Sequence, residues 1–291
     1  MAEIKIFTDT SSDMPLEFYA KHDVGIIPYY TTFDKVTYLK EHVELSPADF
    51  YARLKAENVI PSTSMPTVPD FTEAFRPYLE KGMDIFHVNM SSLFSGSYQC
   101  AVSAARELKE EFPGREVYIM DSIQAAGGQG LTLYQAIKMR EAGFALPEII
   151  ARMEEIKHTS RVFLTIDQLK FLQKGGRIGK VTAFGGMLLQ IKPIIVMRQG
   201  ELNPDGKVRG RQKAIDKVFE ITMEHVRDGA GNYDFAVVHS DCAEEAEALQ
   251  KRLKDAGCSC EFPILLLGVT IGSHTGPTLL GIAVIRKYDK K

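Results

Sequence analysis

In the first half of the chain, short apolar runs alternate with longer segments whose apolar residues recur at helical spacing. The apolar runs are typical of strands and lie at Ile4–Thr8, Val24–Thr31, Ile85–Met90 and Val117–Asp121. The segments with helical spacing are Ser46–Asn58, Thr67–Lys81, Ser97–Phe112, Gly128–Ala142 and Pro147–His158. Strands separated by helices of this length predict a parallel sheet that is covered on both faces.

The pattern changes near residue 160, where strand-like runs follow one another more closely. Lys192–Arg198 and Glu201–Val208 flank a Gln-Gly turn and predict a hairpin. Further strands are predicted at Arg161–Ile166, Asp234–His239, Phe262–Leu267 and Leu280–Lys287, with helices at Lys213–Arg227 and Ala243–Ala256. We therefore expect an α/β protein of two domains: an N-terminal parallel-sheet α/β domain over 1–160, and a C-terminal α+β domain with a mixed or antiparallel sheet over 161–291.

Composition narrows the class of protein. The chain has 291 residues, 45 % of them hydrophobic and 25 % charged, which is ordinary for a soluble globular protein. A formal net charge of −3 argues against a nucleic-acid binder. No apolar run approaches the ~20 residues that span a bilayer, and the polar N-terminus is not a secretion signal. Four cysteines without paired spacing favour neither a disulfide scaffold nor a metal site. These features predict a cytoplasmic protein.

Common catalytic and cofactor motifs do not match. Gly175–Lys180 has glycines before a lysine, but their spacing is wrong for a phosphate-binding loop, and Val181 follows where Ser or Thr is needed. Gly272–Gly276 places its serine one position too early for a nucleophile elbow. No metal-ligand spacing is found. We therefore expect neither a metal nor a cofactor.

Three hydroxyl-rich segments carry the candidate chemistry. They are Pro61–Thr67, Ser91–Tyr98 and Ile271–Gly281, and the third lies beside the apolar runs Phe262–Val269 and Leu279–Ile285. Polar donors next to apolar strands predict a site that holds a small polar head group at the mouth of an apolar pocket.

Individual residues in and near these segments are candidates to bind an anion. Ser95 and Gly96 precede a predicted helix, whose first N–H groups attract anions, although Ser95 also fits a simple N-cap. Thr63 and Ser64 precede a predicted helix and add more hydroxyl groups than one helix cap requires. A proline-rich turn would also explain them. Arg177 follows two glycines and is suited to a carboxylate or phosphate, or is an ordinary surface residue.

His274 and its neighbour Thr275 complete the set. The imidazole is able to bind an anionic head group or to act as an acid or base, and a structural role is the alternative. If Ser95 and His274 lie within hydrogen-bond reach, the chain is instead a stand-alone small-molecule phosphotransferase or hydrolase, with serine as nucleophile and histidine as base.

Several segments together resemble the DegV family, which includes bacterial fatty-acid-binding proteins that serve fatty acid kinase. The matching segments run in family order and cover nearly the whole chain. They are Thr8–Pro15, Ser62–Thr67, Ser91–Ala101, the Asp121-Ser122 pair, Leu169–Gly179, Ile191–Ile195, Lys207–Ala214 and Ser273–Gly281. The sequence departs from the family pattern where Met65 replaces a common glutamine and Thr278 a common glycine, and Phe94 and Cys100 are less usual.

The resemblance implies that this chain is a carrier and not an enzyme. A long-chain fatty acid would lie in a tunnel at the domain interface, with its carboxylate near Thr63, Ser64, Ser95, Gly96, Arg177, His274 and Thr275. A partner fatty acid kinase would phosphorylate that carboxylate, and the acyl phosphate would pass to a membrane acyltransferase for phospholipid synthesis. The apolar tunnel lining is expected to include Ile27, Phe163, Phe184, Met187, Leu188, Ile194 and Leu266.

A basic segment is a candidate docking surface. Lys207, Arg209, Arg211 and Lys213 fall within seven positions. They would suit an acidic kinase surface or anionic lipid, whereas a solvated hairpin edge and helix start is the alternative.

Overall fold

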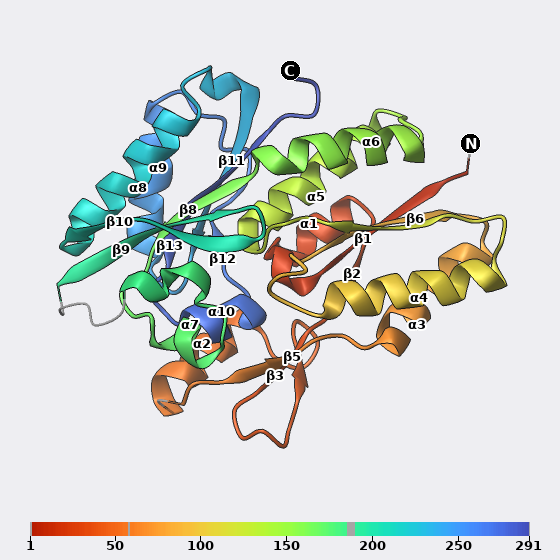
Figure 1. The fold of residues 1–291 in the computed structure, drawn as a ribbon, viewed down its shortest axis with the longest axis horizontal. Coiled ribbons are helices and arrows are strands. Elements are labelled where there is room, and N and C mark those ends of the chain that lie inside the picture. Colours follow the sequence, from red (N-terminus) through yellow and green to blue (C-terminus); the bar gives the residue numbers. More distant parts are fainter. Residues whose placement is uncertain (1, 58, 185–189, 291) are drawn as a thin grey trace.

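The computed structural model describes residues 2–57, 59–184 and 190–290, and its N-terminal sheet is parallel (Figure 1). The strand order is β2-β1-β6-β7. The strands are β1 (Ile4–Asp9), β2 (Val24–Ile27), β6 (Asp84–Asn89) and β7 (Val117–Asp121). All three pairings are parallel, so the predicted parallel sheet is confirmed.

Helices cover both faces of this sheet. On one face lie α3 (Val68–Glu80) and α4 (Ser97–Glu111), and on the other lie α1 (Leu16–Lys21), α5 (Ala126–Glu141) and α6 (Leu146–Ile156) (Figure 1). Helix α4 buries Ser97, Ala101, Ala104 and Leu108, which share one face because they recur every three or four residues. The same spacing in the sequence predicted this helix.

The C-terminal sheet has six strands in the order β10-β9-β8-β13-β11-β12. The strands are β8 (Arg161–Thr165), β9 (Ile191–Arg198), β10 (Glu201–Arg209), β11 (Tyr233–His239), β12 (Leu265–Leu266) and β13 (Leu280–Arg286). All pairings are antiparallel except β11 with β12, so the mixed sheet expected here is confirmed. Helices α8 (Arg211–His225) and α9 (Ala243–Asp255) cover its outer face (Figure 1).

A small antiparallel sheet and three helices close the region below both large sheets in Figure 1. The sheet has the order β4-β3-β5, with β3 (Tyr30–Thr32), β4 (Leu39–Lys40) and β5 (Ser62–Ser64). The helices are α2 (Pro47–Glu57), α7 (Lys170–Lys174) and α10 (Val269–Thr275). Short 3-10 turns lie at Thr10–Ser12, Lys157–Thr159, Gly179–Phe184 and Ala230–Asn232.

Three sequence predictions need correction in this region. The strand expected over Val24–Thr31 is two strands in different sheets, separated at Pro28, which has no N–H to continue a ladder. Ser62–Ser64, expected to be a turn, pairs with β3. The hydroxyl-rich segment Ile271–Gly281, whose three glycines favour a loop, begins inside helix α10.

Helix α5 joins the two large sheets. It is buried on nearly every side, as expected for a helix that lies between two layers. Its buried glutamines reach both sheets, since Gln129 Nε2 donates to Asp9 in β1 and Gln135 Nε2 donates to Asp234 in β11. One apolar cluster accordingly runs from the N-terminal sheet through α5 to the C-terminal sheet. The domain boundary at residue 160 stays a prediction.

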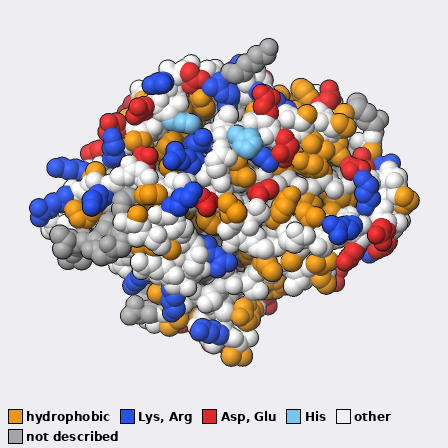
Figure 2. All heavy atoms as spheres, in the orientation of Figure 1, with side chains coloured by type: hydrophobic (Ala, Val, Ile, Leu, Met, Phe, Trp, Pro, Cys, Tyr) orange, Lys and Arg blue, Asp and Glu red, His pale blue; other side chains and the backbone are white. Residues whose placement is uncertain are grey.

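Charged groups are dispersed over the face in Figure 2, with Lys and Arg gathered at the end where the β9–β10 hairpin and the start of α8 lie. Lys207, Arg209 and Lys213 are exposed there. Arg211 instead pairs with Glu245 and Asp167, so it serves the fold. Among the described residues, none of the helices is long and apolar enough to cross a membrane.

Candidate ligand-binding site

A cavity of about 310 Å³ lies among α5, the inner face of the C-terminal sheet, the small sheet and α10. This volume is at the lower end of the range typical of ligand pockets. Its apolar wall is formed by Met90, Phe94, Ala125, Ala126, Val162, Leu164, Ile166, Leu172, Met197, Leu202, Val238, Leu267, Ile271 and Leu279. The wall therefore draws on both halves of the chain.

Several residues predicted to line the apolar wall lie on the opposite face of their strand. Val162 and Leu164 of β8 border the cavity, whereas Phe163 between them packs in the core under α8 and α9. Ile194 of β9 belongs to that outer core too. Successive strand residues point to opposite faces, so a shift of one position exchanges the two sets.

Two other expected wall residues also lie away from the cavity. Leu266 packs with the cluster around α2, and its neighbour Leu267 borders the cavity instead. Ile27 packs against α3 and α4, on the far face of the N-terminal sheet. The side chain of Phe184 and the whole of Met187 and Leu188 lie outside the described residues.

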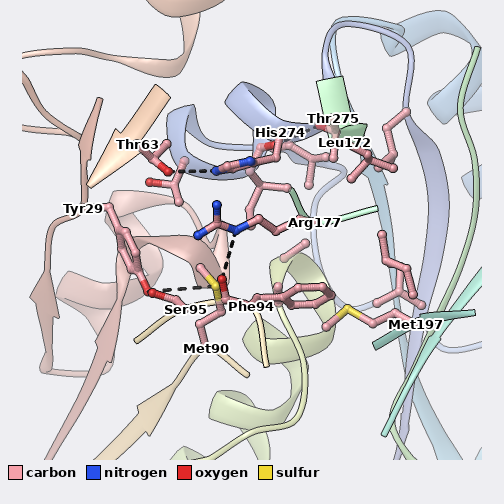
Figure 3. A pocket seen from close by; sticks show the side chains of 18 of the residues that line it. Tyr29, Thr63, Met90, Phe94, Ser95, Leu172, Arg177, Met197, His274 and Thr275 are labelled. Carbon is pink, nitrogen blue, oxygen red and sulfur yellow. Dashed lines mark hydrogen bonds between the residues drawn. The ribbon is translucent and has the colours of Figure 1, made fainter. Parts of the chain in front are cut away.

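All seven residues predicted to hold the head group border the cavity. They are Thr63, Ser64, Ser95, Gly96, Arg177, His274 and Thr275. Figure 3 shows Thr63, Ser95, Arg177 and His274 around one end, with Met197 at the other. The structure thus brings together donors that are separated by more than two hundred positions in the sequence.

His274 is held between β5 and the end of α7. Its Nε2 lies 2.8 Å from Thr63 Oγ1. Its Nδ1 has no hydrogen-bond partner in the described structure, and a Cβ placed on Gly175 would stand 2.2 Å from it. Burial, with a smaller contribution from the Arg177 charge, lowers the pKa of His274 to about 4. The imidazole is therefore neutral at physiological pH and acts by hydrogen bonding.

Arg177 spans the mouth of the cavity. It is exposed, its Nε donates to the Phe94 carbonyl at 3.1 Å, and its Nη1 donates to the Gly175 carbonyl at 2.6 Å. These two bonds orient the guanidinium, and within the described residues its Nη2 has no protein acceptor. The group is thus placed to bind an anion at the opening.

Other residues at the cavity contribute fewer free donors to the site. The Thr275 hydroxyl donates to the Ile271 carbonyl within α10, so it is committed to the helix. Gly96 lets the Met65 side chain pack close to the backbone, since a Cβ on Gly96 would stand 3.0 Å from Met65 Sδ. Met65, which departs from the family pattern, is 41 % exposed and therefore forms part of the rim.

Ser95 makes hydrogen bonds that its sequence position alone did not predict. Its Oγ accepts from Tyr29 Oη at 3.0 Å and from the Ser97 amide at 3.2 Å (Figure 3 shows the first). Tyr29 is buried and borders the cavity, but it follows an apolar strand, and the sequence analysis did not single it out. No hydrogen bond joins Ser95 to His274 among the described residues, so nothing here favours the nucleophile–base pair.

Two buried carboxyl groups fix helix α10 from behind the cavity. Glu41 is 0 % exposed, and its carboxylate accepts from the Val269 amide and from the amide and hydroxyl of Thr270. Asp13 Oδ1 accepts from the Gly268 amide at 2.9 Å. Burial raises the pKa of both carboxyls, and the Glu41 charge raises that of Asp13 further. Neither role was predicted from the sequence, although Asp13 lies in a segment that carries the family resemblance.

Asp13→Asn is expected to stabilise the protein increasingly as the pH rises. The folded protein keeps a proton on Asp13 that the unfolded chain releases above the ordinary pKa of 3.8, so wild-type stability falls as the pH rises past that value. Asn does not titrate, its carbonyl still accepts from Gly268, and it tolerates the left-handed backbone at φ 54°. Urea unfolding at pH 4 to 8 measures the difference.

Asp34→Asn is the matched control. The amides of Val36 and Thr37 donate to Asp34, which lowers the pKa of its carboxyl, so the folded and unfolded chains are both ionised there above the ordinary pKa of 3.8. The stability difference between Asp34→Asn and the wild type should therefore stay nearly constant from pH 4 to 8. A constant Asp13→Asn difference across the pH range would show that Asp13 is not held protonated.

The fold and the site define a two-sheet α/β protein with a cavity that is apolar along its wall and donor-lined at one end. A family model described as "Uncharacterised protein, DegV family" matches residues 3–287. The chain therefore belongs to the DegV family, and its fold is that of the family.

Curated relatives match over nearly the full length. A DegV domain-containing protein of Clostridium perfringens is 34 % identical over 284 residues, covering 97 % of each chain. Protein DegV of Bacillus subtilis is 32 % identical, covering 96 % of this chain and 98 % of its own.

Solved structures of similar proteins carry a functional description. A stearic acid-binding protein of Eubacterium ventriosum superposes with a TM-score of 0.94 at 30 % identity, covering 99 % of both chains. DegV of Bacillus subtilis, described as a fatty acid binding protein, gives a TM-score of 0.87 at 30 % identity, covering 99 % of this chain and all of its own. Within the described part of this chain, no cluster of His, Cys, Asp and Glu is suited to hold a metal.

Proposed function

We propose that this chain binds a long-chain fatty acid, with the acyl chain along the apolar wall and the carboxylate at the end formed by Thr63, Ser95, Arg177 and His274. The observation that carries this proposal is the separation of the two surfaces within one cavity. The fatty-acid-binding descriptions of the Eubacterium ventriosum and Bacillus subtilis structures support the same ligand class.

The energetics suit an amphipathic anion. Each CH₂ that leaves water for an apolar wall contributes ~0.8 kcal/mol. A carboxylate is costly to bury unless it is hydrogen-bonded or paired. Hydroxyl donors and a guanidinium at one end offset that cost and leave the rest of the cavity dry.

We further propose that the bound acid is presented to a partner fatty acid kinase, which forms an acyl phosphate for delivery to a membrane acyltransferase. The family resemblance supports this role. The sequence contains no phosphate-binding loop of its own, so the phosphate would come from the partner. Arg177 is exposed and borders the cavity, which supports a carboxylate end that a partner is able to reach.

Mass spectrometry of the purified protein tests the ligand. Native spectra, followed by spectra after organic extraction, should show one long-chain fatty acid per chain. A ligand-free protein that also fails to take up added palmitate would contradict the proposal. Turnover of a small phosphate ester or acyl ester by the isolated chain would favour the stand-alone enzyme.

Arg177→Ala is expected to slow phosphorylation of bound palmitate by purified fatty acid kinase by at least about tenfold. The reason is that hydrogen bonds to charged groups contribute about 1.5–3 kcal/mol. Lipid stoichiometry should stay near one, because the apolar wall is intact. Lys174→Ala, an exposed cation on α7 that does not border the cavity, is the matched control. Equal rates for the two variants would remove Arg177 from the head-group site.

A further inference from the structure

Tyr29 connects the cavity to a buried hydrogen-bond network behind it. The residue lies between Pro28 and strand β3, is 3 % exposed, and anchors its amide on Thr10 Oγ1 at 3.1 Å. Its hydroxyl reaches the start of α4, where it donates to Ser97 Oγ at 2.6 Å and to Ser95 Oγ at 3.0 Å. The Tyr29 hydroxyl thus lies within hydrogen-bond distance of both serine oxygens.

The orientation of this network is fixed at its inner end. Asn89 Nδ2 donates to the Met90 carbonyl at 2.8 Å, and a carbonyl only accepts, so the amide cannot be flipped. The second Nδ2 hydrogen goes to Ser97 Oγ at 3.0 Å. Asn89 Oδ1 then faces His87 Nε2 at 3.0 Å, which requires the proton of this neutral imidazole to be on Nε2.

The network determines what Ser95 offers to a ligand. Its oxygen already accepts from the Ser97 amide and from Tyr29, which fills both acceptor positions of a hydroxyl. Its own hydrogen makes no hydrogen bond to another protein atom in the described structure. Burial raises the pKa of Tyr29 far above the physiological range, so the phenol stays a donor at every relevant pH.

We propose that Tyr29 is a positioning residue that makes Ser95 a donor only, so that Ser95 favours acceptor-only groups such as an ionised carboxylate over an alcohol of equal chain length. This inference rests on the proposed function. Arg177 likewise only donates. An alcohol hydrogen would find no acceptor at Ser95, and sites built from buried polar groups discriminate strongly against a ligand that leaves them mismatched.

Tyr29→Phe tests the proposal because it keeps the ring and removes the donor. Calorimetric titration of the delipidated protein gives the ratio of palmitate affinity to 1-hexadecanol affinity. In the variant, Ser95 regains an acceptor position, so the ratio should fall about tenfold, corresponding to the ~1.4 kcal/mol of one hydrogen bond. Tyr19→Phe is the matched control, since Tyr19 is 1 % exposed, bonds Ser12 and the Met14 amide, and does not border the cavity. Its ratio should equal that of the wild type.

A second measurement uses the wild type and does not depend on the variant folding. The ¹³C shift of carboxyl-labelled palmitate reports the ionisation of the bound head group as the pH is lowered. The titratable groups around Ser95 are Arg177 and His274 on the cavity side and Asp9 behind Tyr29. His274 is neutral above about pH 4, so its own titration does not contribute to the shift over the range from pH 8 to 5. We expect the ionised form throughout, and Tyr29→Phe should raise the pKa of the bound acid.

The outcomes separate the two proposals. If the wild type binds palmitate and Tyr29→Phe leaves the affinity ratio unchanged, the role of Tyr29 is wrong and fatty acid binding stands. A bound carboxyl that is protonated at pH 7 would also overturn the donor-only site. If the wild type binds neither palmitate nor the alcohol, the proposed function itself fails.

Discussion

Leu164→Trp is expected to abolish fatty acid uptake while the chain stays folded. Leu164 is 5 % exposed and points from β8 into the cavity, so the added indole would occupy the space of the acyl chain. Because that space is empty of protein atoms, the larger side chain does not need to displace the core. Extraction and mass spectrometry should find less than a tenth of the wild-type lipid, and circular dichroism should retain the wild-type spectrum.

Phe163→Leu is the control for this experiment, because residue 163 precedes Leu164 on the same strand and points to the opposite face. It should lower stability through the core under α8 and α9, yet keep full lipid stoichiometry. Lipid retained in folded Leu164→Trp, or lost in folded Phe163→Leu, would place the acyl chain elsewhere.

Gly268→Ala should have the largest effect on stability. An added Cβ would stand 2.2 Å from Glu41 Oε1 and 2.8 Å from Asp13 Oδ1, so both buried carboxyls would have to move. Overpacking and the loss of buried hydrogen bonds together predict a destabilisation of about 2–5 kcal/mol. Urea unfolding gives this value, and palmitate affinity should also fall because α10 carries His274.

Gly114→Ala provides the reference for this change. A Cβ on Gly114 meets nothing within 4 Å, so alanine there should leave stability unchanged or slightly improved. If Gly268→Ala unfolds with the same midpoint as Gly114→Ala, the carboxyls of Glu41 and Asp13 do not hold helix α10 in position.

The sheets were predictable because their strands carry the clearest periodic signal. The run Ile85–Met90 and the hairpin around Gly200 are defined by local patterns, and both form close to where they were expected. Which face of β8 borders the cavity was not predictable in the same way. Both faces of that strand are buried and apolar, so its sequence has no polar–apolar alternation to mark the inner side.

The polar residues that border the cavity were recognisable because short hydroxyl residues and glycines concentrate in turns beside apolar strands. Tyr29 and Glu41 gave no such signal. Tyr29 follows an apolar strand and is an ordinary residue there. Glu41 lies in a polar segment between the half-buried residues Lys40 and His42. Their roles come from contacts with Ser95 and with α10, which are far away in the sequence and close only after folding.

The shared apolar cluster through α5 bears on how the protein unfolds. Separating the two large sheets would expose both sides of helix α5, which is buried almost all round. It would also break hydrogen bonds that Gln129 and Gln135 make to Asp9 and Asp234. We therefore expect that neither half is stable alone and that the chain unfolds in one cooperative transition. A ligand in a cavity lined by both halves binds only the folded state, so it raises the melting temperature of the entire molecule.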